Sequence, residues 1–171
     1  MKANFIMITG GQRSGKSEYA EKLALKMSER PVYLATAAVL DDEMRERVAK
    51  HRLRRGDNWR NIEERLLLSE ISIPPGEVVL IDCLTLWATN WFLESDCDSS
   101  IALTKIKNEI SALLEKDATF IAVTNEIGLG GISENDIQRK FTDLQGLVNQ
   151  YVAEISSEVY MTISGIAIRI K

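Results

Sequence analysis

A glycine-rich segment near the amino terminus has the residue types and spacing needed to bind a triphosphate. It fits the G-x-x-x-x-G-K-S pattern of a Walker A loop and consists of Gly10, Gly11, Gln12, Arg13, Ser14, Gly15, Lys16 and Ser17. Glycine at the two fixed positions lets successive backbone N–H groups turn inward toward a phosphate. We expect Lys16 to reach the outer phosphates and the Ser17 hydroxyl to hold Mg²⁺. The pattern therefore predicts a protein that binds a nucleoside triphosphate.

The segments on either side of this loop are those that the motif requires. Residues 4–9 form a short apolar run that predicts a buried strand, and residues 17–27 carry apolar side chains at helical spacing. The amino terminus of that helix would add partial positive charge at the phosphate site. A glycine-rich turn that binds nothing is the alternative, and the complete pattern between a strand and a helix disfavours it.

Asp82 is a second candidate for the nucleotide site, because it ends the apolar run 77–82. Such runs are typical of parallel strands that are covered on both faces. A carboxylate at the end of such a strand is where P-loop proteins keep the Walker B acid, which holds the metal directly or through water. Asp82 could instead only cap the following helix. We favour the metal role and expect Mg²⁺ to lie near Ser17 and Asp82.

The only histidine, His51, lies in a basic segment of an acidic protein. Residues 45–55 include six positively charged side chains, although the whole chain has a net charge of −4. We expect a helix over residues 41–54, beside the carboxyl end of a second strand at residues 31–36, where α/β sheets bind ligands. The surrounding positive charge favours a neutral imidazole, which is a nucleophile that could attack phosphorus. A solvated basic helix with an incidental histidine is the alternative, and the residues alone leave both open.

The rest of the chain alternates between predicted strands and helices. This order predicts a single α/β domain over residues 1–171, with a mostly parallel sheet, helices on both of its faces and a carboxy-terminal antiparallel hairpin. An apolar stripe at helical spacing predicts one long core helix and consists of Ile137, Phe141, Leu144, Val148, Tyr151 and Ile155. The other expected strands cover residues 59–63, 118–124, 158–163 and 166–170, and the other helices cover residues 66–71, 84–94 and 101–115.

Composition argues against several other classes of protein. No segment approaches the roughly 20 apolar residues of a membrane span, and residues 5–8 are too short a run for the core of a secretory signal. The net charge of −4 argues against general binding of nucleic acid. Cys83 and Cys97 have neither zinc spacing nor a CxxC arrangement, which favours a reduced, cytoplasmic setting.

Several further segments follow one another in an order that is more specific than the glycine-rich loop alone. They are residues 9–17, 40–44, His51, residues 59–60 and 124–128, then Phe141, Asp143, Gly146, Asn149 and Gln150, and finally residues 164–166. In this order the chain, from about residue 5 to its end, resembles the bifunctional adenosylcobinamide kinase/adenosylcobinamide-phosphate guanylyltransferase family. The resemblance implies a P-loop NTPase fold of the RecA-like type.

The resemblance also implies two successive reactions in cobalamin assembly. The enzyme would phosphorylate adenosylcobinamide with ATP or GTP and then transfer GMP from GTP to that product, giving adenosylcobinamide-GDP and pyrophosphate. Family members form homotrimers and pass through a covalent guanylyl-histidine, which would correspond to His51. Besides the glycine-rich loop, the nucleotide contacts would fall on Thr36, Ala37, Ala38, Arg52, Leu53, Arg54, Arg55, Glu63 and Asp82.

Three other functions remain as alternatives. One is a kinase for small molecules in which His51 is incidental, and another is a nucleic-acid-dependent ATPase, which salt-sensitive oligonucleotide binding would reveal. The third is a regulatory GTPase. Residues 143–146 do spell its D-x-x-G motif, but they fall inside the long apolar stripe, and the sequence has no N-K-x-D motif. The aromatic residues near Trp87 and Trp91 could contact a corrinoid, or they could belong to the core or to a trimer interface.

Overall fold

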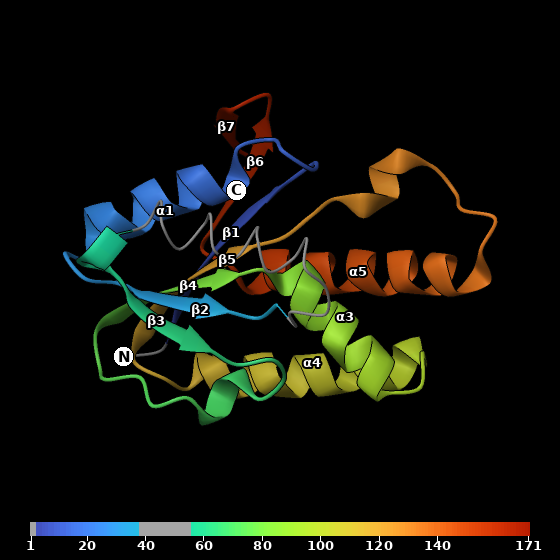
Figure 1. The fold of residues 1–171 in the computed structure, drawn as a ribbon, viewed down its shortest axis with the longest axis horizontal. Coiled ribbons are helices and arrows are strands. Elements are labelled where there is room, and N and C mark those ends of the chain that lie inside the picture. Colours follow the sequence, from blue (N-terminus) through green and yellow to red (C-terminus); the bar gives the residue numbers. More distant parts are fainter. Residues whose placement is uncertain (1–2, 38–55) are drawn as a thin grey trace.

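The computed structural model describes residues 3–37 and 56–171, and these form the predicted α/β arrangement (Figure 1). A seven-stranded sheet has the strand order β3-β2-β4-β5-β1-β6-β7. All neighbouring strands run parallel except β6 and β7, which form the expected antiparallel hairpin. The strands are β1 (Asn4–Gly10), β2 (Val32–Ala35), β3 (Arg60–Glu63), β4 (Glu77–Asp82), β5 (Ala118–Val123), β6 (Glu158–Ile163) and β7 (Ile166–Arg169).

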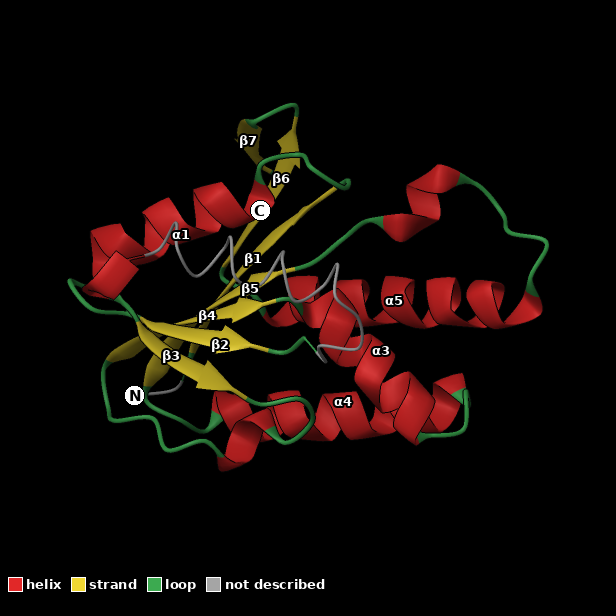
Figure 2. Ribbon diagram, viewed as in Figure 1, coloured by secondary structure: helices red, strands yellow, loops and turns green. Residues whose placement is uncertain are grey.

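Helices cover both faces of this sheet, as the alternating pattern predicts (Figure 2). Helix α1 (Lys16–Met27) lies on one face, and α3 (Leu84–Glu94), α4 (Ser99–Leu114) and α5 (Asp136–Ile155) pack on the other. Within the described residues, three short 3₁₀ segments lie in the connections: η1 (Gly56–Asn58), η2 (Leu68–Glu70) and η3 (Ile127–Gly130). The brief helix expected near residues 66–71 is therefore a 3₁₀ turn. No helix among the described residues is long and apolar enough to cross a membrane.

The central strands are buried on both faces, which explains their nearly continuous apolar sequences. In β1, Phe5 and Met7 join the core beneath α3, α4 and α5, whereas Ile6 and Ile8 join the core beneath α1. Successive side chains of a strand point to opposite faces, so one strand contributes to both cores. β1 is therefore held firmly at the position from which the glycine-rich loop leaves the sheet.

The prediction that the apolar stripe of α5 faces the core is confirmed along most of the helix but is wrong for its first turn. Leu144 and Val148 are completely buried, and Phe141 and Tyr151 are half-buried against the same core. Ile137, in contrast, is 50% exposed. The first turn of α5 projects beyond the edge of the sheet, so no core lies beneath it (Figure 1).

The aromatic residues of α3 belong to the core. Trp87 is completely buried, and its indole N–H donates to the carbonyl oxygen of Leu66 at 2.9 Å. Trp91 and Phe92 are 7% and 2% exposed. The sequence left open whether these aromatic residues contact a corrinoid, form a trimer interface or belong to the core, and their burial supports the core. Trp87, Trp91 and Phe92 therefore present no surface to a corrinoid.

Candidate nucleotide-binding site

The topology brings the predicted site residues to one edge of the sheet. The carboxyl ends of β2, β3 and β4 lie side by side, because Ala35 pairs with both Asp82 and Glu63. Asp82 also pairs with Val123 at the end of β5, which is the neighbour of β1. The glycine-rich loop, Asp82 and Glu63 therefore share one rim, which is where α/β sheets bind ligands.

Both fixed glycines of the loop are required by its geometry. Gly10 and Gly15 have φ angles of +152° and +95°, which side chains rarely allow. A Cβ atom on Gly10 would lie 2.5 Å from the carbonyl oxygen of Thr162, and one on Gly15 would lie 3.1 Å from the Cα atom of Gly165. Helix α1 begins directly after Gly15, so its free N–H groups face the loop, as an anion site requires.

The carboxy-terminal hairpin holds the loop from behind. The buried hydroxyl groups of Ser14 and Thr162 are hydrogen-bonded at 2.7 Å, and the N–H of Gly165 donates to the carbonyl oxygen of Ser14 at 2.9 Å. Ser164 and Gly165 both have positive φ angles, as the tight turn of a hairpin requires. The sequence predicts this hairpin, but no local signal indicates that it would pack against the loop.

We expect Thr162→Val to lower the free energy of unfolding by about 1–3 kcal/mol, because it leaves the buried Ser14 hydroxyl without its partner. It should also weaken nucleotide binding, because the loop would lose part of its support. Urea unfolding and nucleotide titration measure the two effects. Thr119→Val, at a half-buried site on β5, is the matched control. Equal stability of the two variants would contradict the role of the hairpin.

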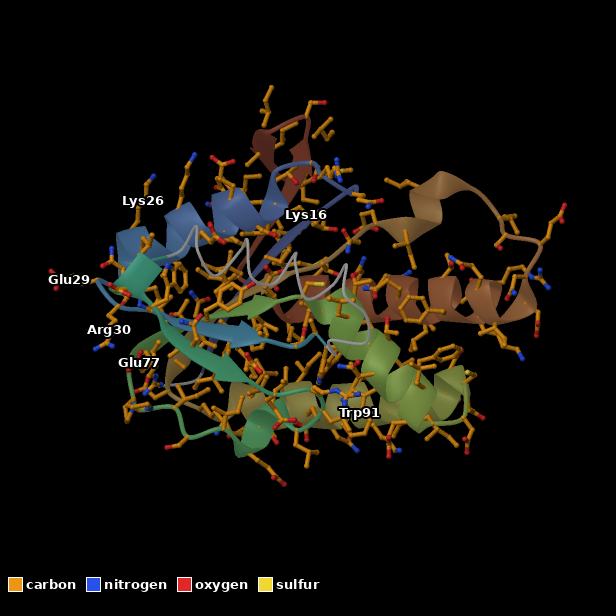
Figure 3. The ribbon with its side chains drawn as sticks, in the orientation of Figure 1. Lys16, Lys26, Glu29, Arg30, Glu77 and Trp91 are labelled. Atoms are coloured by element: carbon orange, nitrogen blue, oxygen red, sulfur yellow. The ribbon has the colours of Figure 1, made fainter. Side chains whose placement is uncertain are left out.

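The side chain of Lys16, which is expected to contact the phosphates, is buried against the glycine-rich loop. It is 8% exposed, and its Nζ atom donates to the carbonyl oxygen of Gly11 at 2.6 Å. Burial lowers the pKa of Lys16, and the electrostatic influence of Cys83 and Asp82 partly opposes this shift. Lys16 lies at the loop end of α1, whereas Lys26 lies at the far end of the same helix (Figure 3). A bound phosphate would take the place of the Gly11 carbonyl.

Asp82 fits the role of a metal ligand. The hydroxyl of Tyr33 donates to its Oδ2 atom at 2.7 Å, which orients the carboxylate at the rim. Mg²⁺ is usually bound through one or two carboxylates, water molecules and substrate phosphates. The described residues contain no cluster of three or more histidine, cysteine, aspartate or glutamate side chains that could hold a metal ion. Sequence reasoning missed Tyr33, which has no motif of its own.

A buried polar network ties helix α5 to the same rim. The hydroxyl of Thr9 donates to Glu126 Oε1 at 2.6 Å, and the amide of Asn149 donates to the same oxygen at 3.1 Å. On the other side of Asn149, its Oδ1 atom accepts hydrogen bonds from Thr124 and Gln145 at 2.7 and 2.8 Å. The sequence analysis gave Thr9, Glu126 and Asn149 no role in the site: Thr9 ends the predicted strand 4–9, and all three belong to the segments that carry the family resemblance. Their contacts now make them supports of the loop.

The other predicted site residues lie as follows. Thr36 is completely buried, and its hydroxyl donates to the carbonyl oxygen of Cys83 at 2.8 Å, so it supports the end of β2. Ala37 and Glu63 lie beside a pocket of about 420 Å³, whose described lining also includes Glu64 and Arg65. The helix expected over residues 41–54 lies outside the described residues. The remaining predicted site residues also lie outside them, namely Ala38, His51, Arg52, Leu53, Arg54 and Arg55.

Comparison with known proteins identifies the family. A family model described as "Cobinamide kinase / cobinamide phosphate guanyltransferase" matches residues 6–170 of the chain. The chain belongs to this family. Two members of it, CobU of Escherichia coli and CobP of Pseudomonas aeruginosa, are each named "Bifunctional adenosylcobalamin biosynthesis protein" and are each 38% identical to this chain. The alignments cover 97% and 96% of this chain and 99% and 96% of the relatives, so the cobinamide kinase resemblance extends over essentially the whole protein.

Solved structures support the fold independently of close sequence similarity. A Pyrococcus horikoshii protein, known from a structural study of PH0250, aligns with a TM-score of 0.56 at 11% identity. The alignment covers 98% of this chain and 86% of the Pyrococcus chain. An ATPase of a bacterial type III secretion system aligns with a TM-score of 0.55 at 14% identity. This alignment covers 92% of this chain and 50% of the ATPase chain. Together with the family match, these similarities establish the P-loop NTPase fold.

Proposed function

We propose that this chain carries out both reactions for which its family is named. It phosphorylates adenosylcobinamide with ATP or GTP and then transfers GMP from GTP to adenosylcobinamide phosphate, releasing pyrophosphate and forming adenosylcobinamide-GDP. The observation that carries the proposal is the glycine-rich loop, with Lys16 inside it and Asp82 on the same rim, in a chain that matches the family over residues 6–170.

In the kinase step, the hydroxyl of the acceptor attacks the γ-phosphorus and ADP or GDP leaves. Lys16 and the inward-facing N–H groups of the loop stabilise the charge that spreads over the transferred phosphoryl group. Ser17 and Asp82 would hold Mg²⁺, which supplies further neutralisation of the phosphates when it is bound. The protein contributes mainly by positioning the two reactants and by placing positive charge around them.

In the transfer step, His51 attacks the α-phosphorus of GTP, and the bond to the departing pyrophosphate breaks. The GMP held on the imidazole is then attacked by the phosphate of adenosylcobinamide phosphate, which frees the histidine. Cys83 is the thiol nearest to Lys16 and Asp82, but burial raises its pKa to about 12. It stays protonated at neutral pH, which makes it a poor nucleophile and favours the histidine route. Because the two steps attack different phosphates, the γ-phosphate must face the acceptor in the first step and the α-phosphate must face His51 in the second.

The oligomeric state, cofactor and location belong to the same proposal. The β6–β7 hairpin carries exposed aliphatic side chains at the edge of the sheet: Ile163, Ile166, Ile168 and Ile170, all at least 49% exposed. Exposed apolar edges usually mark surfaces that are covered in an assembly, which supports the proposed homotrimer.

We further propose Mg²⁺ as the cofactor and the cytoplasm as the location, the latter because the two cysteines have no disulfide pairing in the described residues.

GTP labelled on its α-phosphate tests the covalent half of the proposal. The purified protein is incubated with Mg²⁺ and labelled GTP, without a corrinoid, and is then denatured and examined for bound label. We expect stoichiometric labelling that is lost in acid and stable in base, as a phosphoramidate should be. Absence of label from a protein that demonstrably binds GTP would overturn the transferase half and leave a small-molecule kinase.

A further inference from the structure

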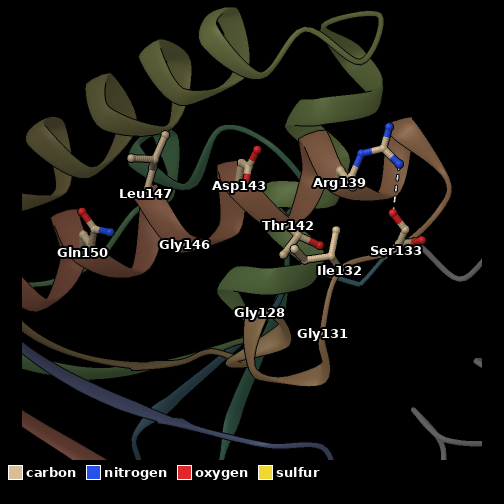
Figure 4. A pocket seen from close by; sticks show the side chains of 10 residues that line it. All are labelled: Gly128, Gly131, Ile132, Ser133, Arg139, Thr142, Asp143, Gly146, Leu147 and Gln150. Carbon is tan, nitrogen blue, oxygen red and sulfur yellow. Dashed lines mark hydrogen bonds between the residues drawn. The ribbon is translucent and has the colours of Figure 1, made fainter.

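A cavity of about 730 Å³ lies between η3 with its following loop and the face of helix α5 (Figure 4). Its lining combines glycine and aliphatic surface with a few polar groups. The floor and walls include Gly128, Ile132, Thr142, Asp143, Gly146 and Gln150. Among the described residues, none of the nucleotide contacts implied by the family resemblance lines it, so the described part of the proposed nucleotide site leaves this cavity without a role.

Both walls of the cavity are attached to the rim that carries the glycine-rich loop. The η3 wall follows directly after Glu126, whose N–H donates to the carbonyl oxygen of Gly10 at 3.2 Å. The α5 wall is attached through Asn149, whose amide nitrogen donates to Glu126 and also to the carbonyl oxygen of Asn125 at 3.0 Å. A ligand in the cavity would therefore lie against elements that are hydrogen-bonded to the start of the glycine-rich loop.

The lining chemistry does not fit a second nucleotide. Phosphates require several convergent cations or N–H groups, whereas the described lining of the cavity contains one arginine, Arg139, and one carboxylate, Asp143. Arg139 already donates from Nη1 to the carbonyl oxygens of Ser133 and Glu134, at 2.9 and 2.6 Å. Apolar surface with scattered hydroxyl, amide and carboxylate groups suits a large ligand that carries neutral amides. A corrin macrocycle, with its apolar ring and peripheral carboxamides, has this chemistry.

Gly146 provides an independent observation. It lies in the middle of α5, where glycine is the least favourable residue apart from proline. A Cβ atom added there would meet nothing within 4 Å, so neither packing nor backbone geometry within the described residues requires a glycine. Its bare backbone lines the cavity, which indicates that something approaches the helix closely at this point.

We propose that this cavity binds the corrin ring of the acceptor and that Gly146 allows the ring to lie against the backbone of α5. The inference rests on the proposed function, because it assigns a place to that reaction's acceptor. It accounts for the hydrogen bonds that connect the walls of the cavity to the start of the loop, for the nearly neutral charge of the described lining and for the glycine inside the helix. The acceptor hydroxyl then reaches the γ-phosphate from the α5 side of the rim.

Gly146→Leu tests the assignment, because Gly146 lines the cavity and an added Cβ atom would meet none of the described residues within 4 Å. We expect the KM for adenosylcobinamide in the kinase reaction to rise at least about tenfold, while the KM for ATP stays within about twofold. The melting temperature should not fall, because leucine favours the helix over glycine. Asn108→Leu, at an exposed position of α4 outside the cavity, is the matched control and should leave both constants unchanged.

Four outcomes would overturn the inference. An unchanged KM for adenosylcobinamide would show that the cavity does not hold the corrin ring. Equal rises in both KM values would contradict the inference as well, because it requires an effect that is specific to the acceptor. A changed oligomeric state with normal kinetics would instead assign Gly146 to a subunit interface. A wild-type protein that binds ATP but does not phosphorylate adenosylcobinamide would overturn the proposed function and this inference together. Gly146→Ala, which adds one methyl group, should raise the same KM to a smaller extent and keeps the test decisive if the leucine variant fails to fold.

Discussion

Replacing Lys16 with alanine should lower kcat/KM of both reactions by roughly 100-fold or more, because one preorganised donor to the phosphates is lost. Lys16 is 8% exposed and is already aligned along the loop by its 2.6 Å bond to the Gly11 carbonyl oxygen. Its ammonium group therefore needs little rearrangement to reach the outer phosphates. Both reactions start from a bound nucleoside triphosphate, so both should suffer.

The measurement follows release of ADP or GDP in the kinase step and of pyrophosphate in the transfer step. Lys22→Ala is the matched control, because Lys22 lies on the same helix and forms an exposed ion pair with Glu18. We expect its rates to stay within about twofold of the wild type, since exposed ion pairs contribute little. A normal kinase rate in Lys16→Ala would contradict the role assigned to the glycine-rich loop.

The environment of Lys16 also predicts how nucleotide affinity depends on pH. Burial lowers its pKa from the usual 10.5, so in the free protein the ammonium loses its proton at a lower pH than an exposed lysine does. A neutral amine attracts phosphate less strongly than an ammonium. Affinity for GTP should therefore fall as the pH rises through this lowered pKa, and the fall should be absent from Lys16→Ala.

Replacing His51 with asparagine should reduce guanylyl transfer by roughly 1,000-fold or more, because the variant has no nucleophile to attack the α-phosphorus. The kinase step should be largely retained, since it uses the loop, Lys16 and the acceptor hydroxyl rather than the imidazole. The two reactions of one protein would thus be separated by a single substitution.

Two labels distinguish the steps in the same preparation. Transfer of the γ-phosphate of ATP to adenosylcobinamide reports the kinase activity, and it also shows that the variant is folded. Label from the α-phosphate of GTP, found on the denatured chain, reports the covalent intermediate. Persistent transfer of GMP by His51→Asn would refute the assignment of the nucleophile, whereas loss of both activities would indicate that the substitution damages the common nucleotide site.

The sequence by itself determined the parts of this protein that depend on neighbouring residues. The spacing of Gly10, Gly15 and Lys16 between an apolar strand and a helix predicts the nucleotide loop, and the structure gives both glycines backbone angles that favour glycine. The strands, most of the helices and the final hairpin follow from short apolar runs, from period-3.6 patterns and from turn residues. These signals are local, because backbone conformation and side-chain direction are set within a few residues.

Only the tertiary structure decided which distant residues meet. Ser14 contacts Thr162 across 148 positions of the chain, and Tyr33 orients Asp82 across 49. Periodicity identifies an apolar face of a helix, but it does not say what lies against that face. For this reason Trp91 is in the core, whereas Ile137, on the apolar stripe of α5, is at the surface. Contacts of this kind depend on strand order and on where each helix ends relative to the sheet, which no local pattern encodes.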